Sequence, residues 1–302
     1  MQNYDYIITG SGASGLMLAY RMAKDSFFDN ASILIIDKEK KTSNDRTWCF
    51  WENDKGEWDD LVHKSWNKIL FDSHSYKKSI PLQSYTYKMI RSAKFYEKLW
   101  NFIESKNNIS FIKAKVTSIL DTAEGALVET STGRYRAVKL LNSIDLDQKY
   151  TRQEEYPVLL QHFTGWFIET KKNIFDDSVA TFMDFTVDQK MNTRFMYVLP
   201  VSANKALFEY TLFSKDVLTK EEYELELQKY LELNSISEYT IIEKEKGIIP
   251  MTSFKFWQDN SKNILNIGTV GGWTKASTGY TFKNTSKKTI QLIAFLKTEN
   301  DF

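Results

Sequence analysis

The sequence predicts an α/β protein in which a parallel sheet flanked by helices is interrupted by an inserted antiparallel-sheet domain. The first observation is the order strand, glycine loop, helix and strand within residues 4–37, which is typical of a parallel sheet. The second is a series of strand-like segments between residues 156 and 251, interrupted by one helix. The third is a buried strand and a helix near the C-terminus, which return the chain to the first domain.

The first elements of the chain predict a βαβ unit. The apolar run Tyr4–Thr9 predicts a buried strand, and Ser32–Asp37 predicts a second one. Between them lies the glycine loop Gly10–Gly15, which leads into a helix over residues 13–25 whose apolar side chains recur at helical spacing. The two strands are therefore expected to lie parallel, with the helix on one face of the sheet.

The rest of the first domain is less regular. Residues 38–78 are polar and rich in tryptophan, which predicts loops with short strands. Residues 87–105 predict a helix, because their apolar residues fall near one face. Several short strands with glycine turns follow over residues 109–144, as in an antiparallel meander, and residues 140–144 are expected to return to the main sheet.

The second half of the chain predicts a broad antiparallel sheet and then a return to the first domain. A helix over residues 220–233 interrupts the strands, while residues 261–269 predict a buried strand and residues 276–296 a helix. The expected strands of the inserted sheet cover residues 163–169, 179–187, 193–200 and 205–213. We therefore expect one domain from residues 1–155 and 256–302, and an inserted domain from residues 156–255.

Charge and composition exclude several classes of protein. Forty basic residues face 39 acidic ones, a formal net charge of +1, which argues against a broad nucleic-acid-binding surface. Cys49 is the sole cysteine, so no intrachain disulfide and no four-cysteine zinc site is possible. The histidines His63, His74 and His162 lie far apart, so no metal site is expected. Cys49 stands between aromatic residues, which favours a buried structural role.

The hydropathy pattern predicts a soluble or peripheral protein. The N-terminus lacks the basic region of a secretory signal, and every apolar run is shorter than the roughly 20 residues that a membrane helix needs. A reducing cytoplasm fits this composition. Aromatic residues make up 15% of the chain, enough to fill a core or to line a long apolar pocket.

The loop after the first strand carries the pattern GxGxxG. The first glycine permits a tight turn, the second lets the backbone approach a pyrophosphate, and the third allows close contact between helix and strand. The start of the following helix offers N–H groups and a positive partial charge to phosphates. The candidate cofactor contacts here are Gly10, Gly12, Ala13, Ser14 and Gly15.

Asp37 ends the second strand, about 20 residues after the glycines, where a carboxylate would accept hydrogen bonds from a ribose. The alternative is a simple glycine turn in which Asp37 caps a strand. The combination of two strands, loop, helix and acid favours a Rossmann-type dinucleotide site. The motif does not distinguish FAD from NAD.

Four segments resemble the lycopene β-cyclase family of carotenoid enzymes. They are the loop GSGASG and the segments NDRTWCFW at residues 44–51, KALFEYTLFS at 205–214 and GTVGGWTKASTGYTF at 268–282. Smaller matches are LQHFTGW, TFMDF, FMYVLP and GIIPM, and the resemblance extends in order from residue 2 to about residue 296. Members of the family run further, with another helical stretch, so the chain is either a short member or part of a longer one.

The resemblance implies a flavoprotein of the glutathione-reductase-like, aromatic-hydroxylase-like fold. It assigns FAD to the discontinuous domain and a carotene to the inserted one. The family converts the open ψ-ends of lycopene to β-ionone rings, a net isomerisation that needs reduced FAD, with NADPH as the usual reductant. Lycopene lives in a bilayer, so the chain is expected in the cytoplasm, in peripheral contact with the inner face of the membrane.

A cyclase needs an acid in an apolar pocket, where burial raises a carboxyl pKa. Glu209 lies in the apolar stretch ALFEYTLF, and alternation places Leu207, Glu209 and Thr211 on one face of a strand. The sequence alone equally allows a solvent-facing glutamate. Because the family requires the acidic residue of this segment, the resemblance makes Glu209 the first candidate for the acid or the cation stabiliser.

A second carboxylate, Asp184, lies among aromatic residues in FMDF. Its candidate role is to assist proton transfer or to hold the pocket, and the alternative is a hydrogen-bonded residue at a turn or strand edge. Aromatic residues of the inserted domain are candidates to stabilise a carbocation by cation–π attraction, although each is individually more typical of a core. They include Phe182, Phe185, Phe195 and Tyr197.

The resemblance also suggests further cofactor contacts. Arg46 lies in the segment DRTW, where this fold brings a loop near the flavin, and a surface salt bridge with Asp45 is the alternative. Thr269 stands where most related flavoproteins have an aspartate, so it offers a hydrogen bond without charge. An ordinary helix cap is the alternative for residues 278–280. The candidates are Arg46, Arg91, Val116, Gly268, Thr269, Thr278, Gly279 and Tyr280.

Two other functions remain compatible with the sequence. One is a redox flavoprotein of the same fold, such as a monooxygenase or a prenyl reductase, which would consume NADPH. The other is a non-catalytic flavin- or carotenoid-binding protein. The sequence does not distinguish cyclisation of one end from cyclisation of both.

Overall fold

A computed structural model describes residues 1–298 and 301–302, and this part of the chain divides into two compact units. The first unit comprises residues 1–43, 92–157 and 252–302, and the second comprises residues 44–91 and 158–251. The expected limits of the inserted domain, 156 and 255, lie close to these borders. Residues 44–91 were expected in the first domain, but they belong to the second unit because one of their strands pairs with its large sheet.

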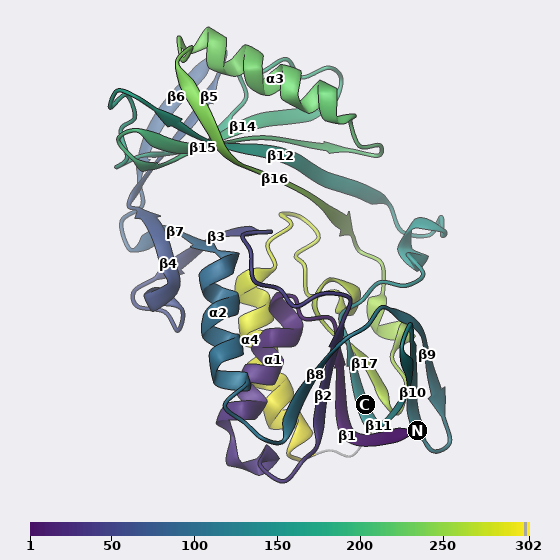
Figure 1. Ribbon diagram of the computed structural model, residues 1–302. Helices are drawn as coiled ribbons and strands as arrows, with labels where there is room; N and C mark the ends of the chain where they lie inside the picture. Colours follow the sequence, from purple (N-terminus) through teal and green to yellow (C-terminus); the bar gives the residue numbers. More distant parts are fainter. Residues whose placement is uncertain (299–300) are drawn as a thin grey trace. The chain divides into compact units, whose positions relative to one another are not determined.

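The first unit contains a sheet with a parallel centre (Figure 1). Its parallel pairs join β8 to β2, β2 to β1, β1 to β11 and β11 to β17, while β9 and β10 extend the sheet as an antiparallel meander. The strands are β1 (Gln2–Thr9), β2 (Ile33–Asp37), β8 (Ile109–Lys113), β9 (Val116–Thr122), β10 (Gly125–Thr130), β11 (Gly133–Asn142) and β17 (Ile264–Asn266). The predicted βαβ unit, the meander and the return of residues 140–142 to the main sheet are confirmed.

Three helices of the first unit pack beside one another, as Figure 1 shows: α1 (Ala13–Lys24), α2 (Ser92–Ile103) and α4 (Phe282–Leu296). Two helix starts were predicted wrongly. Residues 85–91 form a strand because they pair with two neighbouring strands, so α2 begins only at Ser92. The last helix begins at Phe282, since residues 275–280 form a hydrogen-bonded turn before it.

The second unit is built on a seven-stranded sheet of order β16-β12-β15-β14-β13-β5-β6 (Figure 1). Its strands are β5 (Lys68–Ser73), β6 (Tyr76–Pro81), β12 (Val158–Thr170), β13 (Ala180–Asp184), β14 (Thr193–Ser202), β15 (Lys205–Ser214) and β16 (Tyr239–Thr252). A small sheet of order β3-β7-β4 accompanies it, with β3 (Thr47–Asn53), β4 (Val62–Trp66) and β7 (Tyr85–Arg91). The predicted antiparallel strands are confirmed, but β16 was missed because a run of four charged residues, Glu243–Lys246, interrupts its apolar pattern.

Each face of the large sheet has its own core. Helix α3 (Lys220–Leu233) begins with a capping box between Thr219 and Glu222 and packs its buried side chains on one face, against Phe208 and Tyr210. The opposite face carries a second core that includes Leu207. Because successive residues of a strand point to opposite faces, Glu209 lies on the face away from α3.

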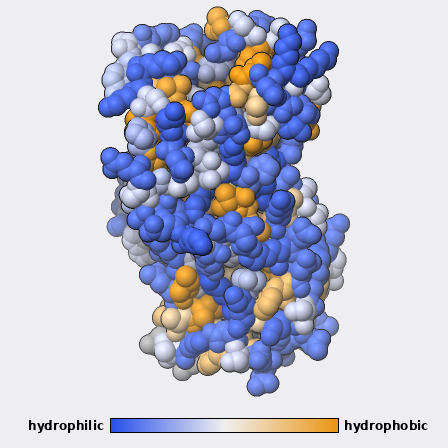
Figure 2. Space-filling view, turned by 90° about the vertical axis from the view of Figure 1, so that its left-hand side faces the viewer, coloured by the Kyte–Doolittle hydropathy of each residue, from blue (hydrophilic) through white to orange (hydrophobic). Residues whose placement is uncertain are grey.

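Short 3-10 turns complete the fold: Ser26–Phe28, Asp59–Leu61, Lys149–Thr151, Phe256–Asp259 and Gly268–Gly271. Among the described residues, no helix is both long and apolar enough to cross a membrane. The same part of the chain contains no group of histidine, cysteine, aspartate and glutamate side chains that could hold a metal ion. Hydrophobic residues on the face drawn in Figure 2 form separate small groups among hydrophilic ones.

Candidate active site

The glycine loop of the first unit folds back tightly between β1 and α1. Gly10 has a φ of +91°, and its N–H donates to the carbonyl of Ile36 (2.8 Å). A β-carbon on Gly15 would lie 1.9 Å from the carbonyl oxygen of Gly10, so this position needs glycine. Gly12 precedes α1 without a side-chain cap, and a β-carbon there would meet nothing within 4 Å. The start of α1 therefore has open space beside it, as close approach of a phosphate requires.

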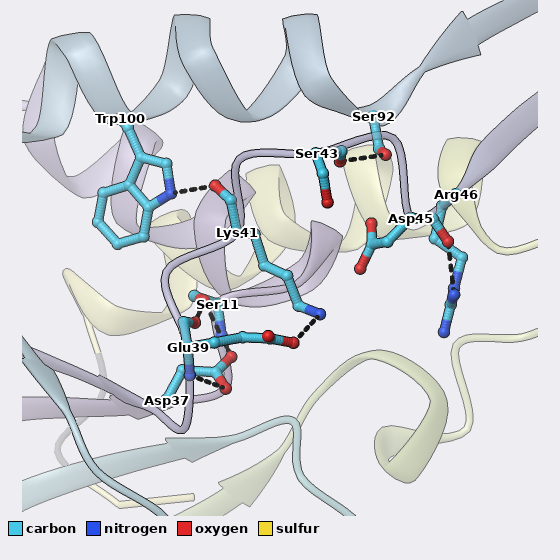
Figure 3. A network of polar contacts seen from close by, with 9 residues as sticks. All are labelled: Ser11, Asp37, Glu39, Lys41, Ser43, Asp45, Arg46, Ser92 and Trp100. Atoms are coloured by element: carbon cyan, nitrogen blue, oxygen red, sulfur yellow. Dashed lines mark hydrogen bonds and ion pairs between the residues drawn. The ribbon is translucent and has the colours of Figure 1, made fainter. Parts of the chain in front are cut away.

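Asp37 ties the end of β2 to this loop, as Figure 3 shows. The N–H and the hydroxyl of Ser11 both donate to Asp37 Oδ2, at 2.6 and 2.9 Å. The other oxygen, Oδ1, has the N–H of Glu39 at 3.4 Å. The carboxylate thus stands at the loop where the sequence places it, and ribose binding by Asp37 stays a prediction.

The segment after β2 is held against α2 by backbone carbonyls (Figure 3). The indole N–H of Trp100 donates to the carbonyl of Lys41 (3.2 Å), and the hydroxyl of Ser92 donates to that of Ser43 (3.1 Å). Arg46 belongs to the second unit, where its Nη1 donates to the carbonyl of Asp45 (2.6 Å). Its expected contact with a flavin stays a prediction.

The C-terminal glycine segment lies against the start of α1. Gly268 has a φ of +65°, and a β-carbon on it would lie 2.4 Å from Ser14 Oγ. The fold therefore brings together two motifs that are about 250 residues apart in the sequence. The hydroxyls of Thr269 and Thr274 lie 3.3 Å apart.

The turn before α4 has a further feature of a ligand site. Gly279 has a φ of +71°, and its N–H donates to the carbonyl of Lys275 (2.8 Å). Lys275 in turn donates its N–H to the carbonyl of Tyr280 (3.0 Å). The hydroxyl oxygen of Thr278 is buried and has no hydrogen-bond partner among the described residues.

These features fit a dinucleotide. The open helix start, the close approach of Gly268 and the unpartnered hydroxyl of Thr278 all leave polar groups for a ligand. Val116, the first residue of β9, is buried, and its expected adenine contact stays a prediction.

Glu209 lies in the second unit at the centre of the large sheet. On its two neighbouring strands, Gly165 of β12 and Tyr197 of β14 stand directly opposite it. The hydroxyl of Thr211 donates to Glu209 Oε1 (2.9 Å), and the glutamate side chain is partly buried. Of the two positions that the sequence left open for Glu209, the structure shows the partly buried one.

A second glutamate, Glu245, reaches the same place from β16, the strand beyond β12. A β-carbon on Gly165 would lie 3.1 Å from Glu245 Cγ and 3.5 Å from Glu209 Cβ, so the two glutamates flank this glycine. The hydroxyl of Thr47 donates to Glu245 Oε2 (2.6 Å). The other oxygen, Oε1, is buried and has no hydrogen-bond partner in the described part of the chain.

The sequence analysis missed Glu245 because β16 resembles an exposed strand with alternating charges. The one available signal was its place two residues before Gly247, where the matched segment GIIPM begins. Glu243, Glu245 and Gly247 lie on one face of the strand. The matched segment GIIPM therefore begins on the same face as Glu245.

The surroundings affect the pKa values of the two carboxyls differently. Burial raises the pKa of Glu209 well above its ordinary value, and the negative charge of Glu245 raises it further. Burial also raises the pKa of Glu245, but the hydroxyl of Thr47 and the positive charge of Arg91 oppose this effect. The surroundings therefore favour a proton on Glu209 over one on Glu245.

Arg91 and Cys49 complete the surroundings of the pair. Arg91 was expected on a helix as a phosphate contact, but it ends β7, forms an ion pair with Glu243 and stacks its guanidinium on Phe167 at 3.8 Å. Burial raises the pKa of the Cys49 thiol, so the thiol is protonated. This agrees with the structural role expected for Cys49.

The aromatic residues that the sequence singled out gather on the Glu209 face. Phe195 and Tyr197 pack edge to face with centroids 5.0 Å apart, and Phe182 contacts Tyr197 at 5.8 Å. Phe185 packs against Phe195 at 5.4 Å. The structure thus places an aromatic wall beside the acid.

Asp184 does not join this group. The hydroxyl of Tyr230 on α3 donates to Asp184 Oδ2 (2.6 Å), and the N–H of Thr186 donates to Oδ1 (2.8 Å). Asp184 pairs with Met196, which packs into the core beneath α3. Asp184 therefore faces α3, on the side of the sheet opposite Glu209, and fits the structural alternative better than a role in proton transfer.

Comparison with known proteins gives a family and a fold. The profile of the lycopene cyclase protein family matches residues 5–299. Lycopene beta-cyclase of Pantoea ananas is 25% identical over 292 residues, which cover 92% of this chain and 71% of that protein.

Solved structures share the fold at low identity. A geranylgeranyl bacteriochlorophyll reductase-like protein from Thermoplasma acidophilum has a TM-score of 0.70 at 12% identity, covering 99% of this chain and 80% of its own. The flavin-dependent brominase Bmp2 has a TM-score of 0.69 at 13% identity, with 99% and 81% covered. The predicted fold class, a Rossmann-type flavoprotein with an inserted sheet, is confirmed.

Proposed function

The chain belongs to the lycopene cyclase family, and from this premise we propose that it is a lycopene β-cyclase. It would convert the acyclic ψ-ends of lycopene, or of a related acyclic carotene, to β-ionone rings, giving γ-carotene or β-carotene. The observation that carries the proposal is the carboxyl of Glu209, whose pKa is raised by burial and by the charge of Glu245, on the sheet face that also carries Phe195 and Tyr197. Such a group is an acid for a neutral alkene.

The proposed reaction moves one proton in and one proton out. The O–H bond of Glu209 breaks while the π electrons of the terminal double bond form a new C–H bond, which leaves a tertiary carbocation. The next double bond attacks this cation, so a C–C bond closes the ring. A ring C–H bond then breaks, its electrons form the ring double bond, and the proton returns to the carboxylate. Reactant and product are isomers.

The surroundings of Glu209 suit a cationic intermediate. The faces of Phe195 and Tyr197 attract a cation by their quadrupoles, which is worth about 0.5–2 kcal/mol for each ring. The negative charge of Glu245 adds a Coulomb attraction at the same place.

We propose FAD, in its reduced form, as the cofactor and NADPH as its reductant. Enzymes of the family need reduced FAD, and bound reduced flavin would supply negative charge and electron density. The open start of α1 would take the pyrophosphate, Asp37 the ribose, and the turn around Thr278 and Gly279 the flavin. Arg46, Val116 and Thr269 remain further candidates.

Lycopene resides in a bilayer, so we propose that the chain works in the cytoplasm in peripheral contact with the inner face of the membrane. The candidate contacts with anionic lipid are the lysines of residues 38–41 and 283–288, of which Lys38, Lys287 and Lys288 are exposed. Binding to anionic and neutral vesicles at low and high salt tests this part.

The test of the function is co-expression with a lycopene-producing pathway, followed by chromatography of the pigments. Wild type is compared with Glu209→Gln and with Glu232→Gln, an exposed glutamate on α3 that serves as control. Cyclised carotenes with wild type and the control, and lycopene alone with Glu209→Gln, are expected. Unchanged lycopene with folded, FAD-loaded wild type would reject the proposal.

A redox flavoprotein is the second candidate, because proteins with this fold include a brominase and a reductase-like protein. Stoichiometry separates the two. A cyclase leaves NADPH unconsumed at steady state, whereas a monooxygenase consumes NADPH and O₂ with each product and a reductase consumes NADPH alone. Binding of FAD or carotene without turnover would favour a non-catalytic binding protein.

A further inference from the structure

Glu245 is buried, and one of its two carboxyl oxygens lacks a hydrogen-bond donor in the described part of the chain. Its Oε2 accepts from the hydroxyl of Thr47, while its Oε1 is buried without a donor in the described part of the chain. A buried carboxylate oxygen without a donor is costly, so such an atom indicates a partner whose proton the heavy atoms do not reveal.

Glu209 is the neighbour that can supply this proton. Gly165 separates the two glutamates, and its missing side chain leaves room for their carboxyls to approach each other. The hydroxyl of Thr211 already donates to Glu209 Oε1, so a proton on the second oxygen of Glu209 is available to Glu245. Two carboxyls in contact cannot both ionise without strong repulsion.

The other groups around the two glutamates act on them unequally. The positive charge of Arg91 on β7 acts to lower the pKa of Glu245, although Arg91 also pairs with Glu243 on β16. From the neighbouring strands, the thiol of Cys49 on β3 lies within electrostatic reach of both glutamates, and Tyr197 on β14 stands directly opposite Glu209.

We propose that Glu209 and Glu245 form a carboxyl pair that shares one proton, in which Glu245 is a positioning residue that keeps Glu209 protonated and orients its O–H. The inference rests on the proposed function for its role in turnover. Glu209 gives its proton to the alkene, the anionic pair faces the carbocation, and the proton released from the ring restores the pair. Glu245 itself touches no reacting atom.

The first experiment measures the proton without activity. Infrared difference spectroscopy of the purified, FAD-loaded protein, titrated in pH, detects a protonated buried carboxyl. The band is expected in wild type and in Glu232→Gln, absent in Glu209→Gln, and titrating about one pH unit or more lower in Glu245→Gln, because loss of the neighbouring charge lowers the pKa of Glu209. Glu245→Asp keeps the charge and is expected to restore most of the wild-type titration.

The second experiment is the pH profile of cyclisation of lycopene in vesicles with NADPH. Activity of Glu245→Gln is expected to fall at lower pH than wild type, with substantial kcat retained on the acid side, whereas Glu209→Gln is inactive throughout. If Glu245→Gln does not fold, Thr47→Val serves, because loss of the hydroxyl weakens the Glu245 anion and moves the basic limb to higher pH.

The outcomes distinguish failure of the proposed carboxyl pair from failure of the proposed cyclase function. A band and a basic limb that stay in place in Glu245→Gln, or in Thr47→Val, would overturn the pair while cyclisation stands. A band that shifts as expected in a protein that never cyclises lycopene would support the pair and reject the proposed function.

Discussion

Gly165 of β12 stands directly opposite Glu209 of β15, and it is the lack of a side chain at this glycine that lets a second glutamate approach from the next strand. Its φ is not in the left-handed region, so the need for glycine here is one of space and not of backbone conformation. The strand order therefore places a glycine between the two glutamates.

Gly165→Ala is expected to separate the two glutamates. The new β-carbon would lie 2.9 Å from Leu207 Cδ1 and 3.1 Å from Glu245 Cγ, which must shift. We expect a loss of about 1–3 kcal/mol in stability and a fall in cyclisation of about tenfold, measured by urea unfolding and by pigment chromatography. Gly133→Ala is the matched control, because its β-carbon would meet only the Tyr135 ring at 3.7 Å or more. Equal activity of both variants would contradict the spacing role.

The stability of the protein is expected to fall as pH rises above the ordinary carboxyl range. The folded-state pKa of Glu209 is raised, so the folded protein holds more protons than the unfolded chain between about pH 4.3 and that pKa, and its stability is lost through this window. Glu209→Gln removes this titration. Melting temperatures from pH 5 to 8 should therefore decline more steeply for wild type than for Glu209→Gln, and parallel declines would argue against the raised pKa.

The glycines of the N-terminal loop are expected to differ in effect. Gly15→Ala places a β-carbon 1.9 Å from the Gly10 carbonyl, which should disrupt the loop itself. Gly12→Ala meets nothing within 4 Å in the protein, so it should leave the melting temperature of the FAD-free protein unchanged. If FAD occupies that space, Gly12→Ala weakens its binding about tenfold or more, measured by flavin fluorescence titration. Unchanged FAD affinity would place the pyrophosphate elsewhere.

Arg91 and Glu243 are expected to be energetically coupled. Arg91 is buried and stacks on Phe167, while Glu243 is partly exposed, so removing the arginine costs more than removing the glutamate. Arg91→Met should destabilise by about 1–3 kcal/mol, and the double variant with Glu243→Gln by less than the sum of the single ones. Urea unfolding of the full cycle measures the coupling energy, and additive effects would show that the ion pair contributes nothing.

Asp184→Asn is expected to affect stability and spare the chemistry. The side chain accepts two hydrogen bonds, one of which the amide loses, so about 1–3 kcal/mol of stability is at risk. Cyclisation per folded molecule should remain within about twofold of wild type, because Asp184 faces α3 and not Glu209. A folded Asp184→Asn protein without activity would show that Asp184 takes part in the reaction.

Much of the fold follows from local pattern. The βαβ unit, the glycine loop and most strands of the inserted sheet were predicted because apolar periodicity and glycine placement act over neighbouring residues. The errors fall where tertiary pairing decides. Residues 87–91 were predicted as the first part of a helix, yet two flanking strands hold them in a sheet.

The sequence by itself determined a Rossmann-type fold and the loop around Gly10, since each depends on residue types within short segments, and its resemblance to a family made Glu209 the first candidate acid. Only the tertiary structure decided that Glu245 meets Glu209, that Asp184 lies on the other face and that Gly268 approaches Ser14. These relations depend on strand order and on which face a side chain takes. A pKa likewise depends on burial and on charges that residues distant in the chain supply, so no local pattern records it.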